Sequence, residues 1–118
     1  MSGAGAGRAE VVYKIVASSL WPTGGQGFDG AAIDLADGFI HFSTRVQVEE
    51  TAARHFAGQD DLLLVAIDAG KLGAALKWEA SRGGDLFPHL YGPLPLSAVL
   101  WARPLRLGDD GRHDFSGL

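Results

Sequence analysis

The order of hydrophobic and polar positions along the chain predicts several short strands around one main helix. Residues 11–17 are rich in β-branched side chains, and residues 62–67 are apolar on both faces, as in a central strand. Residues 76–79 alternate between apolar and polar side chains, which is typical of a strand with one polar face. Shorter strands are predicted at residues 38–43 and 97–103.

Residues 85–96 differ from these strands because they contain three prolines. Proline has no backbone N–H to donate, so we expect this segment to be extended but to lie outside the middle of a hydrogen-bonded ladder. For the same reason Pro104 is expected to end the last strand.

The main helix is predicted over residues 44–58. Thr44 and Gln47 have the spacing of a capping box, in which each side chain hydrogen-bonds to the backbone N–H of the other residue. An apolar residue then recurs at every fourth position, which gives the helix one face suited to packing on a sheet. That face consists of Val48, Ala52 and Phe56.

These elements do not alternate as in a doubly wound sheet, so the predicted class is α+β. The 118 residues suit one compact domain, predicted at 11–107, with a mixed, mostly antiparallel sheet, one main helix and short helical turns. Residues 1–10 and 108–118 are rich in glycine and charge, and they are predicted to be flexible tails.

Composition and charge narrow the classes of partner. The chain has no cysteine, which excludes disulfides, cysteine nucleophiles and thiolate metal sites. Its net charge is −4 and its basic residues are dispersed, so no basic stripe is available for a nucleic acid. No apolar run approaches the roughly 20 residues that span a bilayer, and residues 1–10 contain no apolar signal segment. We therefore expect a cytoplasmic protein that binds neither nucleic acid nor membrane.

The first candidate site lies where a predicted strand runs into the helix N-terminus. Free backbone N–H groups and the helix dipole favour an anion there, and Ser43, Thr44 and Arg45 are placed to bind one. The alternative is that Ser43 or Thr44 only caps the helix. His41 alternates with two apolar neighbours and so faces the other side of the sheet, where it is either a proton-transfer or ligand-binding group or a structural imidazole.

The second candidate group lies on the later strands. Glu79 shares a strand face with Lys77 and is a base, a partner for ribose hydroxyls or one half of a surface ion pair. Three aromatic residues in the extended segment recur at period two and point the same way: Phe87, His89 and Tyr91. This aromatic wall suits a nucleobase or nicotinamide ring, and it equally suits packing of the segment onto the sheet.

Motifs for metals and nucleophiles do not occur in the sequence. The four histidines lack the spacing of zinc ligands, and neither a nucleophile elbow nor a phosphate-binding loop is found. No metal site is predicted.

Two segments together carry a resemblance to a known family. They are GFIHFST at 38–44 and LFPHLYGPL at 86–94, and a tyrosine-containing first strand and the Trp-Glu pair at 78–79 accompany them. In these features, over about residues 12–104, the chain resembles the small bacterial family called domain of unknown function 952. The resemblance implies a fold similar to that of ADP-ribosyltransferases, in which a split sheet holds NAD in a cleft.

The resemblance also implies roles for three residues. Ser43 falls at the second-strand position of those enzymes, and Glu79 falls at their late glutamate. Lys14 stands at the first-strand position, where relatives usually have histidine, and it keeps a hydrogen-bond donor and a positive charge. NAD is the cofactor that such a cleft would take.

Two classes of function stay open at this point. The first is an enzyme in which His41 and Ser43 position NAD or another nucleotide and Glu79 is the polarising carboxylate. The second is a module that binds a small anionic or nucleotide-like metabolite without transforming it, with His89 and Tyr91 among the contacts. A protein-interaction module would instead need an exposed apolar patch, for which Leu94, Leu96 and Trp101 are the candidates.

Overall fold

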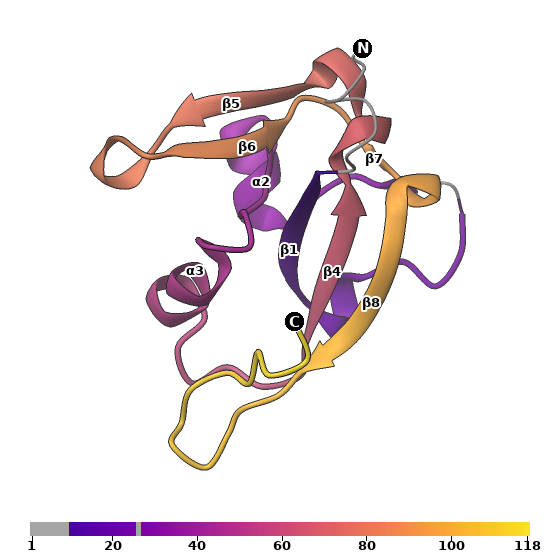
Figure 1. Ribbon diagram of the computed structural model, residues 1–118. Helices are drawn as coiled ribbons and strands as arrows, with labels where there is room; N and C mark the ends of the chain where they lie inside the picture. The colour runs from indigo at the N-terminus through magenta and orange to yellow at the C-terminus, as the bar shows by residue number, and fades with distance from the viewer. Residues whose placement is uncertain (1–9, 26) are drawn as a thin grey trace.

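The first sheet of the molecule has three antiparallel strands in the order β1-β4-β8 (Figure 1). The computed structural model describes residues 10–25 and 27–118. The three strands are β1 (Val11–Ala17), β4 (Leu62–Asp68) and β8 (Val99–Leu105). β4 is the central strand and is mostly buried, as its apolar sequence predicts.

A second sheet pairs three further strands, also antiparallel, in the order β3-β6-β5. They are β3 (Ile40–His41), β6 (Leu86–Leu90) and β5 (Leu76–Ala80). In Figure 1, β5 and β6 form a hairpin that extends away from the first sheet. A two-stranded ladder joins β2 (Gly27–Phe28) to β7 (Leu94–Pro95).

The two larger sheets are joined where the chain leaves β3. The N–H of Phe42 donates to the carbonyl of Pro88 in β6 at 3.0 Å. One residue later, Ser43 exchanges two hydrogen bonds of 2.8 Å with Tyr13 in β1. Residues 40–43 therefore belong first to one sheet and then to the other. The predicted α+β class is confirmed, with a split sheet whose described strand pairs are all antiparallel.

The expectation that the proline-containing segment avoids the middle of a ladder is wrong, because Pro88 lies in β6, the central strand of its sheet. In an antiparallel ladder the N–H and C=O of one residue point to the same neighbour. The carbonyl of Pro88 points to Phe42, the residue at which the segment 40–43 leaves β6 and turns towards β1. The N–H that Pro88 lacks therefore falls where the pairing of β3 with β6 ends. Pro104 also lies inside a strand, β8, which is an edge strand.

Two α-helices, α2 (Ala32–Asp37) and α3 (Val48–His55), accompany the sheets (Figure 1). The capping box forms as predicted, with bonds of 3.0 and 3.2 Å between Thr44 and Gln47. The residues between Thr44 and Gln47 form a turn. The regular helix α3 therefore begins later than predicted and is shorter. The sequence pattern does not predict α2, which ends at Gly38 and so shortens the strand expected there.

Short 3-10 turns occupy five of the connections: Ser18–Leu20, Ala69–Lys71, Gly73–Ala75, Arg82–Gly84 and Leu96–Ala98. Among the helices of the described residues, none is both long enough and apolar enough to span a membrane.

Buried apolar side chains form two clusters, one on each face of the first sheet. In β1, Val12 and Val16 belong to the cluster shared with β2, β3 and β7, whereas Ile15 belongs to the cluster shared with α3. Leu94 is fully buried in the first of these clusters, and its neighbours in the predicted interaction patch are half-buried. The exposed apolar patch that a protein-interaction module would need is therefore not formed by Leu94.

The two predicted tails differ in what the structure describes of them. Residues 1–9 lie outside the described part of the chain. Residues 108–118 make contacts with the domain: His113 Nε2 lies 2.7 Å from the carbonyl oxygen of Gln59, and the side chains of Phe115 and Leu118 lie against the second cluster. The C-terminal segment thus covers part of the core.

Candidate functional site

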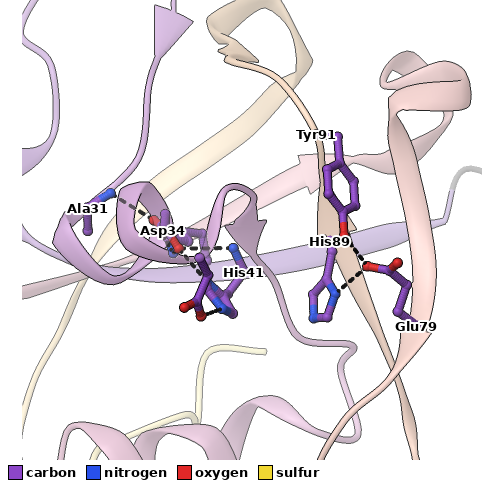
Figure 2. A network of polar contacts seen from close by, with 8 residues as sticks. Ala31, Asp34, His41, Glu79, His89 and Tyr91 are labelled. Carbon is purple, nitrogen blue, oxygen red and sulfur yellow. Dashed lines mark hydrogen bonds and ion pairs between the residues drawn. The ribbon is translucent and has the colours of Figure 1, made fainter.

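Asp34, in α2, is a buried carboxylate with five polar contacts (Figure 2). Lys14 Nζ lies 2.9 Å from each of its two oxygens. The backbone N–H groups of Ala31 and His41 donate to it at 2.7 and 3.0 Å, and His41 Nδ1 lies 2.6 Å from Oδ1. Because both oxygens are fully engaged, Asp34 fixes the positions of β1, α2 and β3 relative to one another.

Two glycines allow this arrangement. Gly30 has a φ of +119°, and a Cβ at this position would lie 2.8 Å from the Cβ of Asp34, so only glycine leaves room for the carboxylate. Gly38 ends α2 in the left-handed conformation with a φ of 86°, and its N–H donates to the carbonyl of Asp34. The chain then returns directly into β3, which brings His41 back to Asp34.

The electrostatics of the group favour an ionised Asp34. Burial alone would raise the pKa of this carboxyl, because the charged form loses its water. The hydrogen bond from His41 and the charge and hydrogen bond of Lys14 outweigh that effect and hold the pKa of Asp34 well below its usual range. Burial lowers the pKa of Lys14, although the neighbouring carboxylate favours the charged ammonium. Lys14 is therefore the ion-pair partner of Asp34.

His41 lies between two carboxylates. Its Nδ1 contacts Asp34, and its Nε2 lies 2.9 Å from Oδ2 of Asp37 at the end of α2. An ionised carboxylate only accepts hydrogen bonds, so both contacts are hydrogen bonds when the imidazole carries a proton on each nitrogen. The geometry thus engages both ring nitrogens of His41 with carboxylates, on a side chain that is one-third exposed.

A second carboxylate–histidine pair lies on β5 and β6 (Figure 2). Oε1 of Glu79 is 2.8 Å from Nδ1 of His89, and the hydroxyl of Tyr91 donates to the same oxygen at 2.8 Å. The hydrogen bonds from His89 and Tyr91 lower the pKa of Glu79, and the bond to Glu79 raises the pKa of the Tyr91 phenol. Within the described residues Nε2 of His89 has no hydrogen-bond partner.

Strand register brings the two histidines together. His41 in β3 is directly opposite His89 in β6, and their ring centroids are 5.6 Å apart. Phe39 stacks on His89 with a centroid distance of 4.2 Å, and it also contacts the rings of His41 and Tyr91. One face of the His89 ring is thus covered, and its Nδ1 edge is held by Glu79.

Both histidines line a pocket of about 470 Å³, which we call the main pocket. Its lining residues come from both sheets, α2 and α3: Tyr13, Lys14, Ile15, Ile33, Asp37, His41, Phe42, Ser43, Thr51, His55, Phe56, Ser81, Phe87 and His89. A volume of this size is in the usual range for sites that bind small organic ligands. Among the described residues no group of three or more histidine or carboxylate side chains is placed to hold a metal ion.

The structure places some of the candidate site residues predicted from the sequence in the main pocket and others outside it. Lys14, His41, Ser43 and His89 line the main pocket. Glu79 and Tyr91 do not line it but lie behind His89, to which Glu79 is bonded.

Thr44 and Arg45, the remaining two, do not line the pocket. Thr44 is occupied by the capping box, and the guanidinium of Arg45 lies 3.5 Å from Glu49 on the exposed side of the helix. Ser43 does not cap the helix; its hydroxyl is 2.8 Å from that of Thr51 in α3. The anion site predicted at the helix N-terminus thus has no Arg45 contribution in this arrangement.

Sequence reasoning missed Asp34, Asp37 and Phe39. A signal for the first was present, because a lysine in the apolar first strand needs a buried counter-charge. The AAIDLAD segment before Gly38 also has a helix-forming composition followed by a C-terminal glycine. No local pattern shows that Phe39 stacks on His89, since these residues are fifty positions apart.

The fold and the site define a small α+β protein with a split antiparallel sheet and a pocket lined by histidines. The chain matches the family described as "Protein of unknown function (DUF952)" over residues 15–102. It therefore belongs to this family, as the two sequence segments predicted.

Solved structures of a related protein have the same fold. The crystal structure of protein CC0527 from Caulobacter crescentus has a TM-score of 0.84 and 48% sequence identity, covering 91% of this chain and 96% of that chain. The solution NMR structure of CC0527 has a TM-score of 0.79 and 47% identity, covering 91% and 94% of the two chains. Both are structural genomics targets. No curated protein matches the chain.

Proposed function

We propose that the main pocket binds a small organic anion that carries a ring, as a nucleotide-like molecule does, and that His89 exchanges a proton or a hydrogen bond with it. The observation that carries this proposal is the contact of His89 Nδ1 with Glu79, while the ring itself lines the pocket. Because Glu79 is not part of the lining, the Nε2 edge of His89 is the one left for a ligand.

The charges of the lining support an anionic ligand. The lining contains four side chains that can carry a positive charge and one carboxylate: Lys14, His41, His55 and His89 against Asp37. Asp34 and Glu79, which contact three of these four, lie outside the lining. Hydroxyl groups add further donors, among them that of Ser43. Phosphate and carboxylate oxygens accept hydrogen bonds from donors of these kinds.

The apolar part of the lining supports a ring. Phe42, Phe56 and Phe87 contribute aromatic surface to the same pocket, and Tyr13 contributes a fourth ring. Aromatic side chains stack on flat ring systems and contribute binding energy beyond the area they bury. A pocket with imidazole donors and aromatic walls suits a nucleotide better than a bare inorganic ion.

The carboxylate–histidine pair is the usual arrangement for an acid–base group. A carboxylate on Nδ1 fixes the tautomer and the orientation of the ring and leaves Nε2 to accept or donate a proton. In this proposal His89 is the catalytic residue of any reaction in the pocket, and Glu79 is a positioning residue behind it. His41 is held in place by Asp34 on Nδ1 and contacts Asp37 through Nε2.

NAD and ADP-ribose are the nucleotides that an ADP-ribosyltransferase-like activity would require. Lys14 and Ser43 line the pocket, but Lys14 is paired with Asp34, and Glu79 reaches the pocket only through His89. A carboxylate in direct contact with ribose is therefore not part of this proposal. Binding without a reaction is the second candidate function, and the pairing of Lys14 with Asp34 favours it.

The test is a titration of ¹⁵N-labelled protein with adenosine monophosphate, ADP-ribose and NAD, followed by amide NMR. We expect saturable shifts at His41, Ser43 and His89 and none at Arg45, whose side chain lies outside the pocket. Absence of shifts at millimolar concentrations of all three compounds would contradict the proposal. If NAD binds, release of nicotinamide distinguishes an enzyme from a binding module, and Glu79→Gln is then expected to abolish that release at unchanged Tm.

A matched pair of variants shows whether His89 itself contacts the ligand. His89→Gln keeps a donor for Glu79 but removes the acid–base group, and we expect about a five- to tenfold higher Kd, the loss of one hydrogen bond. His113→Gln changes a histidine outside the pocket and is expected to leave the Kd unchanged. Equal effects of the two substitutions would remove His89 from the proposed contacts.

A further inference from the structure

We propose that Asp37 occupies the anion position of the main pocket in the free protein, and that the phosphate or carboxylate group of a ligand binds by replacing the Asp37 carboxylate on Nε2 of His41. This inference rests on the proposed function and deepens it, because it names the atom that receives the anion and the residue that competes for it. The juxtaposition behind it is the 2.9 Å contact between His41 Nε2 and Asp37 Oδ2, both residues lining the pocket.

The two carboxylates on His41 are held very differently. The side chain of Asp34 is 1% exposed and is fixed by five polar contacts, so it cannot leave the ring. The side chain of Asp37 is 44% exposed, and His41 is its sole hydrogen-bond partner among the described residues. An exposed side chain changes rotamer on the picosecond to nanosecond scale, so Asp37 can move away without a change in the backbone.

The position of Asp37 in the chain also makes it a weak partner. It is the last residue of α2, and the chain turns at Gly38 into the left-handed conformation. The carbonyl groups at a helix C-terminus carry partial negative charge, which disfavours a carboxylate, and no basic side chain lies in this last turn. The contact with His41 therefore holds Asp37 in place against the local field of the helix.

His41 keeps its position when Asp37 leaves. The 2.6 Å contact of Nδ1 with the buried Asp34 remains and holds the ring in the same orientation. Nε2 then lies at the wall of the pocket with no partner in the described residues, and its N–H is a donor when this nitrogen carries the proton. An incoming phosphate or carboxylate oxygen is the acceptor that matches it, and its negative charge takes the place of the one that Asp37 withdraws.

The test measures binding of inorganic phosphate and of adenosine monophosphate to the whole protein and to Asp37→Asn, by titration calorimetry. Removal of the competing carboxylate is expected to lower the Kd of both probes about two- to fivefold, the range that corresponds to loss of one exposed ion pair. The ¹⁵N signals of the His41 ring are expected to shift with phosphate in the unmodified protein. Asp109→Asn removes the same charge from an exposed loop outside the pocket and is expected to leave both Kd values unchanged.

The outcomes separate this inference from the function on which it rests. If adenosine monophosphate binds the unmodified protein and Asp37→Asn binds it equally or more weakly, Asp37 is a support or a ligand contact, and the inference is wrong while the proposed function stands. An equal gain in Asp109→Asn would also overturn it, because net charge alone would then explain the effect. If neither probe binds either form, both proposals are wrong. Asp37→Glu, which keeps the charge, is expected not to show the gain.

Discussion

At the scale of single residues, the buried carboxylate of Asp34 is expected to contribute strongly to the free energy of unfolding. Asp34→Asn keeps the shape of the side chain but leaves Lys14 buried without a counter-charge. Breaking one side of a buried ion pair typically costs about 3–5 kcal/mol in the free energy of unfolding. We expect a loss in that range, measured by urea unfolding.

Two further variants keep this prediction testable. Asp109→Asn removes an exposed carboxylate and is expected to change the free energy of unfolding by less than about 0.5 kcal/mol. If Asp34→Asn does not fold, the double variant with Lys14→Met removes the unpaired charge and is expected to recover part of the stability. An Asp34→Asn protein as stable as the unmodified chain would show that the pair contributes nothing.

The pH dependence of the same variant gives a second readout. The pKa of Asp34 is lower in the folded protein than in the unfolded chain. Its contribution is therefore fully present above the unfolded value of about 3.9, and it is lost as the pH falls through the folded value. The stability difference between the unmodified protein and Asp34→Asn should be constant near neutral pH and shrink below about pH 4. If the stability difference between the two proteins instead grows as the pH falls, the pKa of Asp34 is not lowered in the folded protein, and the prediction is wrong.

At the scale of elements, the capping box of Thr44 and Gln47 precedes the main helix, and an anion site at the same place stays a prediction. Thr44→Ala removes one of its two reciprocal hydrogen bonds, and we expect a loss of about 1 kcal/mol in the free energy of unfolding. Nucleotide binding should not change, since Thr44 does not line the main pocket. Thr23→Ala, at an exposed loop position, serves as the control for the substitution itself. A weaker affinity in Thr44→Ala alone would restore the anion site that the sequence suggests.

The elements differ in how far the sequence predicts them. β1 and β4 were predictable because a short run of apolar and β-branched residues favours a strand buried on both faces. α2 has a helix-forming composition and a C-terminal glycine, but six residues form no stable helix alone, and the contacts of Asp34 with Lys14 and His41 that stabilise it are tertiary. The position of Pro88 escaped prediction because the place where residues 40–43 leave β6 and pair with β1 is a property of the sheets, not of the local sequence.

At the scale of the whole molecule, the C-terminal segment closes the second core cluster. Phe115 lies half-buried against this cluster, although the sequence of residues 108–118 predicts a tail. Phe115→Ala is expected to lower the free energy of unfolding by about 1–2 kcal/mol, in proportion to the apolar area it covers. Leu100→Ala, at a half-exposed position, should change it by less than about 0.5 kcal/mol. Equal effects of the two substitutions would indicate that the segment does not cover the core in solution.

The sequence by itself determined the α+β class, the family and the buried strands. These properties follow from local patterns, because the alternation of a strand and the spacing of a cap are set by neighbours in the chain. It also marked Lys14, Ser43 and Glu79 as unusual. Their roles as ligand contacts or catalytic groups remain predictions.

Only the tertiary structure decided which charged groups face one another. Lys14 and Asp34 are twenty positions apart, and His41 meets His89 through the pairing of β3 with β6. Sheet register determines which residues lie opposite one another. Burial makes an unpaired charge costly, so a buried charged group is stable only beside a counter-charge. The same reason places Glu79 on Nδ1 of His89 and leaves Nε2 of His89 without a hydrogen-bond partner among the described residues.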